Sequence, residues 1–287
     1  MTTFRYLITA EDAGDQIQHF LRFKQGISRK VVISLKHLPE GILLNGSHAR
    51  TIDLLREGDT LEINLPDQAR KLPPCEIDVP RLYWDRDVAV FNKPAGMPVH
   101  QSGGHIFGTL ASVYATLCEK EGNSGTFRAV NRIDKDTSGL VLAAKHAYAA
   151  PLLARNVEKL YYAVVEGELP LGPGVIDAPI GRRGDSIIGR CVTPEGKPSR
   201  TEYTILRAAQ GLSLAACVPV TGRTHQIRVH FASIGHPLAG DWLYGTEDPG
   251  LILRPALHSY MLTMTHPVTG ELLHFTAPIP ADMQALI

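Results

Sequence analysis

The sequence lacks long hydrophobic runs and paired cysteines. No stretch approaches the roughly 18 consecutive apolar residues of a membrane-spanning helix, and residues 1–15 reach acidic side chains without the basic and apolar segments of a secretion signal. The four cysteines lie far apart, at positions 75, 118, 191 and 217, which favours free thiols over disulfides or zinc ligands. These absences predict a cytoplasmic protein without a membrane partner.

The sequence also lacks an excess of charge, since 29 lysines and arginines balance 29 aspartates and glutamates. This balance excludes a polybasic binder whose affinity for nucleic acid comes from a large cationic surplus. The charge is unevenly distributed, however. Residues 128–230 contain 14 cationic and 9 anionic side chains, whereas residues 1–70 contain nine of each. A local surplus of this kind favours a polyanionic ligand bound at one cleft, with a shallow salt dependence.

Signatures of nucleotide cofactors and metals are missing. Residues 184–189 have the glycine spacing of a P-loop but lack its lysine and its serine or threonine. No Gly-x-Gly-x-x-Gly motif follows a predicted strand, and no Gly-x-Ser-x-Gly motif is present. His225 and His230 are five residues apart, which does not match the four-residue spacing of a helical zinc pair. We therefore expect no cofactor and no metal.

Residues 1–65 have the pattern of a small α+β module. Apolar residues at near-helical spacing (Ile17, Phe20, Leu21 and Phe23) predict a helix over 13–25, and Ser28 is a suitable N-cap for a second helix over 29–37. A short strand over 41–44 leads into an Asn-Gly turn at 45–46, and an alternating strand follows a second turn near 58–59.

A proline-rich segment separates this module from the rest of the chain. Four prolines fall within residues 66–80 together with several polar residues, which predicts a linker there. Residues 81–287 are rich in short strands with few helices between them, which is typical of an α+β domain around a largely antiparallel mixed sheet. The predicted strands lie near 88–91, 139–145, 161–165, 201–208 and 212–218, and the predicted helices near 109–118, 147–156 and 224–233.

Two polar clusters stand out in the second domain. Residues 131–139, Asn-Arg-Ile-Asp-Lys-Asp-Thr-Ser-Gly, directly precede an apolar strand, and so many polar groups favour a loop at a strand edge. There, the Thr-Ser pair can bond to the backbone and hold a carboxylate in place. Residues 221–230, Thr-Gly-Arg-Thr-His-Gln-Ile-Arg-Val-His, suggest a turn and a helix that Thr224 caps, with Ile227, Phe231 and Ile234 on its apolar face. A solvated turn and a helix with ordinary surface arginines are the simpler interpretations.

Together the clusters resemble the RluA-type pseudouridine synthases, which isomerise uridine within RNA. The hallmark His-Arg-Leu-Asp-x-x-Thr-Ser-Gly is matched by residues 131–139, with Asn131 in place of the histidine. Further family motifs follow the same order, at 91–96, 159–163, 196–203, 221–230 and 236–245, so the resemblance covers about 81–287. Residues 1–65 resemble the small αL-type RNA-binding module that often precedes this domain. Their shared features are Ser28-Arg29, Gly41, Asn45-Gly46 and Gly58-Asp59.

The resemblance implies a role for individual residues. Asp134 is then the catalytic carboxylate, Arg228 its salt-bridge partner, and Tyr161 the ring that stacks on the flipped uracil. Arg132 and Arg223 are expected to hold phosphates or to fill the gap left by the flipped base, and Ile227 to pack against the base. In the module, Arg29 and Lys30 are the expected RNA contacts.

The resemblance also implies RNA as the partner, ribosomal RNA rather than tRNA, and a monomeric enzyme. The carboxylate can either attack the anomeric carbon or abstract a neighbouring sugar proton, and the sequence does not choose between them. Two alternatives remain open at this stage. One is a non-catalytic RNA-binding or ribosome-assembly protein, suggested by Asn131. The other is a phosphotransferase of the haloacid-dehalogenase kind, suggested by the Asp-x-Asp at 134–136.

Overall fold

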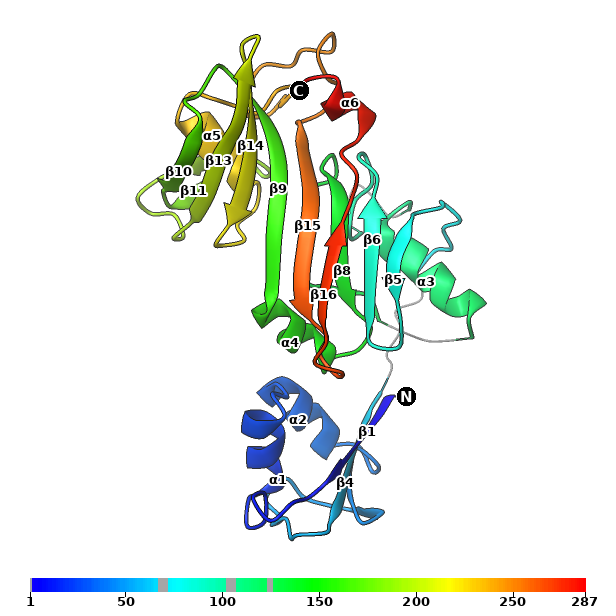
Figure 1. The fold of residues 1–287 in the computed structure, drawn as a ribbon. Coiled ribbons are helices and arrows are strands. Elements are labelled where there is room, and N and C mark those ends of the chain that lie inside the picture. The colour runs from blue at the N-terminus through cyan, green and yellow to red at the C-terminus, as the bar shows by residue number, and fades with distance from the viewer. Residues whose placement is uncertain (1, 67–71, 102–106, 123–125) are drawn as a thin grey trace.

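A computed structural model describes residues 2–66, 72–101, 107–122 and 126–287. Two sheets dominate it, one in each of the predicted segments (Figure 1). Part of the predicted linker, 67–71, lies outside the described residues, and residues 72–80 form neither helix nor strand. Among the described residues, no helix combines the length and the apolarity that crossing a membrane requires.

The N-terminal sheet has four strands in the order β1-β4-β2-β3. Its strands are β1 (Thr2–Leu7), β2 (Ile42–Leu44), β3 (Ser47–His48) and β4 (Thr60–Leu65), and its main helix is α2 (Arg29–Lys36). The Ser28 side chain caps α2 by accepting from the amide of Val31, and Asn45 and Gly46 turn the chain with positive φ angles, both as predicted.

The predicted helix over 13–25 is only partly correct. The chain becomes helical at Ile17, as the short α1 (Ile17–His19), and continues as a π-helical turn over Phe20–Lys24. Ile17, Phe20 and Leu21 are buried, but Phe23 is 65% exposed. Phe23 lies six residues after Ile17 and falls to one side of the face that Ile17, Phe20 and Leu21 define.

The larger sheet has ten strands and is mixed, as predicted. Its order is β10-β13-β14-β9-β15-β8-β6-β5, with β16 also paired to β15 and β7 to β8. Among the described strands of this sheet, the β15–β8 pair alone is parallel. The strands are β5 (Arg81–Trp84), β6 (Val88–Lys93), β7 (Arg128–Ala129), β8 (Ser138–Ala144), β9 (Val157–Glu166), β10 (Gly172–Asp177), β13 (Arg200–Ala209), β14 (Leu212–Pro219), β15 (Leu257–Thr265) and β16 (Leu272–Thr276).

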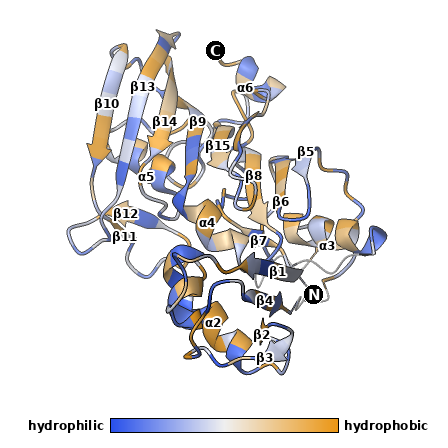
Figure 2. Ribbon diagram, turned by 60° about the horizontal axis from the view of Figure 1, so that its bottom comes forward, coloured by the Kyte–Doolittle hydropathy of each residue, from blue (hydrophilic) through white to orange (hydrophobic). Residues whose placement is uncertain are grey.

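Helices and a small hairpin surround this sheet. The helices are α3 (Leu110–Lys120), α4 (Ala149–Arg155), α5 (Gln226–Ser233) and α6 (Ala281–Gln284), and the hairpin consists of β11 (Ile180–Arg182) and β12 (Arg190–Val192). Hydrophobic residues concentrate on the central strands and on the helices beside them (Figure 2). The prediction for α5 needs correction: the helix begins two residues after Thr224, the residue before it is His225 in the left-handed region, and Ile234 is 40% exposed at its C-terminal end.

Helix α4 joins the two hydrophobic cores. Ala149 and Leu153 belong to the core of the large sheet, whereas Tyr148 and Leu152 pack into the core of the N-terminal module. The Phe4 ring lies 4.7 Å from the Tyr148 ring, and Arg86 donates to the carbonyl of Thr3 at 3.3 Å. The module is therefore held against the end of the large sheet that carries α4 (Figure 1).

Candidate active site

A pocket of about 520 Å³ lies where five distant segments of the chain meet. They are residues 98–101, the loop before β8, the start of β9, the turn that leads into α5, and the start of β15. Five of the residues singled out in the sequence line it: Arg132, Asp134, Tyr161, Arg223 and Ile227. The fold thus brings together side chains that are up to 95 positions apart in the sequence.

Asp134 and Arg228 form the ion pair expected from the resemblance. Arg228 Nη1 lies 3.1 Å from Asp134 Oδ2, and the Asp134 side chain is 25% exposed. Arg228 itself is buried in the first turns of α5, beneath the pocket. Among the described residues, Asp134 Oδ1 accepts no hydrogen bond, so this oxygen is available to a ligand.

The stronger partner of Arg228 is Asp241, a fully buried carboxylate. Arg228 Nε and Nη2 each donate to one Asp241 oxygen at 2.7 Å, which is the bidentate geometry. Asp241 Oδ1 also accepts from the backbone amides of Leu243 and Tyr244. Burial by itself lowers the pKa of Arg228, but the hydrogen bonds and charge of Asp241, together with Asp134, raise it above its ordinary value. Arg228 is therefore a fixed cation that is already neutralised on one side.

The loop that carries Asp134 is fastened at both ends. Asn131, which replaces the family's histidine, is buried, donates to the carbonyl of Leu140 at 2.9 Å and accepts from the amide of Leu142 at 2.7 Å. Farther along, the buried Lys93 ammonium donates to the carbonyl of Lys135 at 3.0 Å and to that of Pro94 at 2.8 Å. Burial lowers the pKa of Lys93 to about 7. Asn131 thus supports the loop from inside the fold.

The expected contribution of the Thr-Ser pair is wrong. The Ser138 hydroxyl is bonded to His258 Nδ1 at 2.9 Å, and the buried Thr137 hydroxyl has no hydrogen-bond partner among the described residues. Neither hydroxyl holds Asp134. Because Ser138 is the first residue of β8, its side chain turns toward the adjacent parallel strand β15, where His258 lies opposite it.

Tyr161 and Ile227 form the apolar floor of the pocket. Both are buried and belong to the same hydrophobic cluster. Burial raises the pKa of the Tyr161 hydroxyl. A flat aromatic ring beside a short aliphatic side chain provides a surface on which a planar base can stack.

The remaining predicted residues lie farther out. Arg132 and Arg223 are exposed at the rim of the pocket, and Arg223 Nε donates to the carbonyl of Pro198 at 3.2 Å. Arg29 and Lys30 are exposed on the first turn of α2, in the N-terminal module, and they do not line the pocket. The predicted residues thus lie in three places: buried at the pocket, exposed at its rim, and exposed on the N-terminal module.

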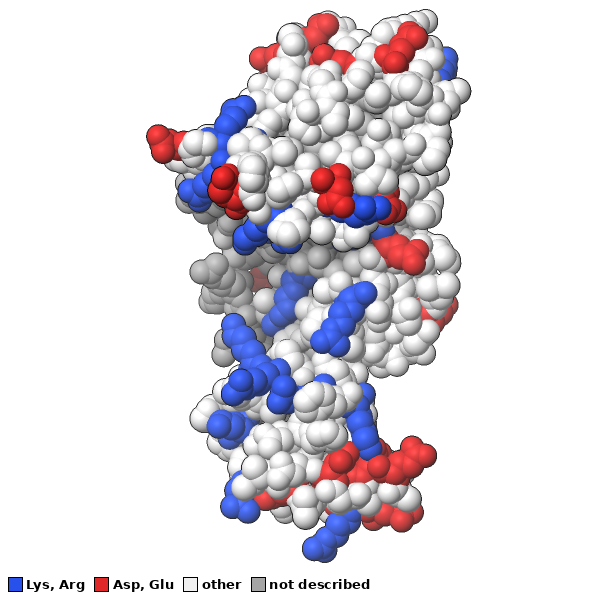
Figure 3. Space-filling model, turned by 90° about the vertical axis from the view of Figure 1, so that its left-hand side faces the viewer, with Lys and Arg blue, Asp and Glu red and all other residues white. Residues whose placement is uncertain are grey.

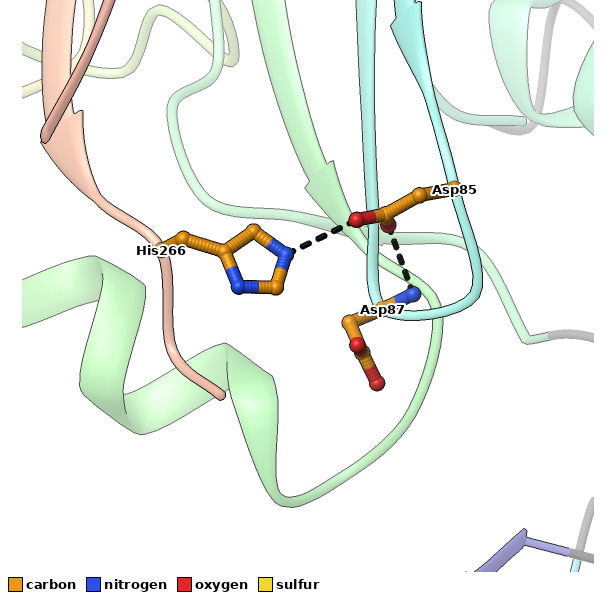
Figure 4. A group of neighbouring side chains, drawn as sticks. All are labelled: Asp85, Asp87 and His266. Carbon is orange, nitrogen blue, oxygen red and sulfur yellow. Dashed lines mark hydrogen bonds and ion pairs between the residues drawn. The ribbon is translucent and has the colours of Figure 1, made fainter. Parts of the chain in front are cut away.

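One group outside the pocket has the composition of a metal site. Ligand atoms of Asp85, Asp87 and His266 lie within 4.8 Å of one another (Figure 4). However, Asp85 Oδ1 accepts from the amides of Asp87 and Val88, and Oδ2 accepts from Tyr83 and His266. His266 Nδ1 accepts from two backbone amides, so its neutral ring carries a proton on the nitrogen that faces Asp85. Because the Asp85 oxygens and the His266 nitrogens already form hydrogen bonds, the group connects the β5–β6 turn to the β15–β16 turn.

Three residues at the site have no role predicted from the sequence. Asp241 and Tyr244 stand in the 236–245 motif, and His225 stands in the 221–230 motif, but neither motif indicates which side chains face Asp134. His225 Nε2 lies 3.8 Å from Asp134 Oδ1, and its Nδ1 lies 2.7 Å from the Tyr244 hydroxyl. In the sequence, these residues are marked only by the many polar residues beside glycines in the two segments.

Comparison with known proteins agrees with this geometry. Residues 87–233 match the family model described as RNA pseudouridylate synthase. The chain is 39% identical to the uncharacterized RNA pseudouridine synthase YjbO of Bacillus subtilis, over 91% of this chain and 95% of that protein. It is 38% identical to ribosomal large subunit pseudouridine synthase D of Xanthomonas campestris, over 85% and 80% of the two chains.

A solved structure has a similar fold. It is that of the human RNA pseudouridylate synthase domain containing 1, with a TM-score of 0.58, 27% sequence identity, and coverage of 72% of this chain and 86% of that chain. These matches confirm the family resemblance seen in the sequence, and they leave no support for a haloacid-dehalogenase fold. The chain belongs to the RNA pseudouridylate synthase family.

Proposed function

We propose that this protein isomerises uridine to pseudouridine in large-subunit ribosomal RNA, with Asp134 as the reacting carboxylate. Family membership makes the chain an isomerase that acts on uridine in RNA. The ribosomal target is supported by relatives that are named for the large subunit. One observation carries the assignment of Asp134: in the pocket, Oδ2 is tied to a buried arginine while Oδ1 stays unbonded among the described residues.

The reaction requires the base to leave the sugar and return through a different atom. The bond from C1′ to N1 of uracil breaks, the base turns, and a bond from C1′ to C5 forms while C5 loses a proton and N1 gains one. Asp134 serves this sequence in one of two ways: it bonds to C1′ as the base departs with the electron pair and leaves again when C5 attacks C1′, or it removes the C2′ proton to leave a glycal and returns that proton as the C1′–C5 bond forms. Both routes need an ionised carboxylate, and Arg228 places a guanidinium cation 3.1 Å from Asp134 Oδ2.

The other pocket residues suit the handling of a flipped base. Tyr161 and Ile227 offer a stacking surface, and Tyr161 is our candidate to accept the C5 proton. At the rim, Arg132 and Arg223 can bind the phosphates on either side of the flipped nucleotide or occupy its place in the helix.

The test uses ribosomal RNA from a strain that lacks the gene. After incubation with purified protein, mapping of pseudouridine by chemical labelling should reveal new modification at a defined uridine of the large-subunit RNA. Asp134→Asn should form none, whereas Asp136→Asn, a change of the same kind two residues away, should remain active. Tight RNA binding without pseudouridine would instead support a non-catalytic binding protein, and modification confined to tRNA would overturn the ribosomal target.

We further propose that the N-terminal module binds RNA through Arg29 and Lys30. Both are exposed on α2, and neither forms an ion pair with another described residue. The module is neutral by count, but other cations are paired: Lys24 contacts Asp12 and Asp15. Lysines and arginines gather over the face where the module meets the larger domain, while acidic side chains lie mainly at the far edge of the module (Figure 3). This separation gives a neutral module one cationic side.

Charge removal tests this assignment. The double variant Arg29→Ala, Lys30→Ala should weaken binding to ribosomal RNA and reduce the slope of log K against log salt by about one to two. Arg56→Ala, an exposed arginine elsewhere in the module, serves as the matched control. Equal affinity for the double variant and the control would exclude this α2 surface as an RNA contact.

A further inference from the structure

We propose that His225 is a positioning residue that orients the Asp134 carboxylate through a neutral imidazole N–H. This inference rests on the proposed role of Asp134 as the reacting carboxylate, and it assigns a function to a residue next to it. His225 lines the pocket directly before α5, and its Nε2 faces Asp134 Oδ1 at 3.8 Å.

The backbone of His225 adopts a conformation that is uncommon for a residue other than glycine. Its φ angle is 57°, in the left-handed region. The other two non-glycine residues with positive φ among those described, Asn45 and Gln210, each precede a glycine in a tight turn between strands. His225 has no such setting, so the surrounding contacts must hold it there. The conformation directs its ring into the pocket rather than along the helix surface.

Hydrogen bonds fix which ring nitrogen carries the proton. The amide of Arg190 donates to the Tyr244 hydroxyl oxygen at 3.0 Å. This hydroxyl meets no acceptor other than His225 among the described residues, so its O–H donates to His225 Nδ1 at 2.7 Å. A neutral histidine that accepts at Nδ1 carries its proton on Nε2. The N–H of the ring therefore points at Asp134.

Burial favours the neutral form of the ring. Burial lowers the pKa of His225, as do the cations Arg228 and Arg190, while the carboxylates Asp134 and Asp241 act in the opposite direction. A neutral ring can donate a hydrogen bond to a carboxylate without adding a second full charge beside it. Asp134 Oδ2 then keeps its ionic partner Arg228, and Oδ1 receives a weaker, directional donor.

The distance fits a contact that closes when substrate binds. The separation of 3.8 Å is roughly 0.8 Å longer than an ordinary N–H···O hydrogen bond, and such bonds often tighten only in the substrate complex. With both oxygens held, the plane of the Asp134 carboxylate is fixed at the wall of the pocket. His225 thus acts through Asp134 rather than on the substrate.

Two substitutions with similar backbone preferences separate this role from a structural one. His225→Leu removes the N–H donor, and His225→Gln retains one at a comparable distance from the backbone. On ribosomal RNA from the strain lacking the gene, His225→Leu should lower the single-turnover rate about 10- to 100-fold with RNA affinity unchanged. His225→Gln should recover most of that rate. His274→Leu, on β16 and outside the pocket, is the control that should stay at the wild-type rate.

Tyr244→Phe provides an independent test should His225→Leu fail to fold. It removes the donor to Nδ1, so the ring can place its proton on either nitrogen, and the single-turnover rate should fall without a change in RNA affinity. Full activity of either His225→Leu or Tyr244→Phe, or equal impairment of the Gln and Leu variants, would overturn this inference. If Asp134→Asn is inactive in the same assay, such a result leaves the proposed function intact; if Asp134→Asn is also active, the proposed function itself fails.

Discussion

Asp134 and Asp241 share the buried guanidinium of Arg228. We predict that the Asp134 carboxylate supports activity and that the Asp241 carboxylate supports stability. The perturbation is the same at both sites, Asp241→Asn and Asp134→Asn. Asp241 is fully buried and receives four hydrogen bonds, two of them from Arg228 at 2.7 Å. Asp134 is 25% exposed and receives one, at 3.1 Å.

The magnitudes follow from these contacts. An asparagine at 241 has one acceptor oxygen, so its NH₂ group must face an Arg228 N–H as donor against donor. Removing one partner of a buried ion pair costs about 3–5 kcal/mol. For a chain of this size, each kcal/mol lowers the melting temperature by roughly 2–4 °C, so we expect a fall of about 6–20 °C. At 134, the amide oxygen can still accept from Arg228, and the unfolding free energy should change by no more than about 1 kcal/mol.

Thermal and urea unfolding measure the stability of each variant, and pseudouridine mapping on unmodified ribosomal RNA measures its activity. Asp134→Asn should be stable and inactive, whereas Asp241→Asn should be destabilised. Glu247→Gln, an exposed carboxylate that follows the same motif, controls for the change of net charge and should shift stability by less than about 0.5 kcal/mol. The reasoning is refuted if Asp241→Asn is as stable as this control, or if Asp134→Asn is destabilised as much as Asp241→Asn.

Three further predictions concern other parts of the molecule. Lys93 has a pKa of about 7 in the folded protein and its ordinary, higher pKa in the unfolded chain. At a pH between these two values only the unfolded chain binds the proton, so this group makes the free energy of unfolding rise with pH. This contribution is up to about 1.4 kcal/mol per pH unit, and it should be absent from the unfolding free energy of Lys93→Met measured by denaturant titration. A pH profile identical to that of the wild type would contradict the assignment. Tyr148→Ala should split thermal unfolding in calorimetry into one transition for the N-terminal module and one for the larger domain, whereas Tyr260→Ala should leave a single transition. A single transition in both variants would show that the Tyr148 contact is not what couples the module to the larger domain. The slope of log K against log salt for RNA binding should be shallow, and a slope equivalent to ten neutralised phosphates would refute this expectation.

Local features of the fold could be predicted from sequence because their causes are local. The Ser28 cap and the Asn45-Gly46 turn depend on one or two residues, and the alternating strands carry their own periodicity. The position of β15 between β9 and β8 could not be predicted, because it depends on pairings with segments about 100 residues away in the chain. The same reason hid β1, whose partner β4 lies some sixty residues further on.

The candidate site shows the same division. The resemblance pointed to Asp134, Tyr161 and Arg228 because these residues stand in motifs that can be matched one by one. Asp241 stands in the 236–245 motif, but the motif gives this residue no role. Only the fold reveals that its carboxylate reaches Arg228 from a different segment. Asn131 was recognised as a departure from the family pattern. Its two bonds to the backbone of β8 give it a structural function that no pattern in the linear sequence indicates.

The structure also changes how the cationic surplus of residues 128–230 should be understood. Not all of the 14 lysines and arginines counted there can meet phosphates. Arg228 is buried between two carboxylates, Arg200 pairs with Asp177 and Glu202, and the Lys145 ammonium lies 3.7 Å from the centre of the Trp84 ring. Because paired cations release few counterions from RNA, the sequence count overstates the electrostatic part of binding. We therefore expect affinity to depend more on base stacking in the pocket and on RNA shape than on charge, and this is the reason for predicting a shallow salt dependence from an enzyme whose substrate is a polyanion.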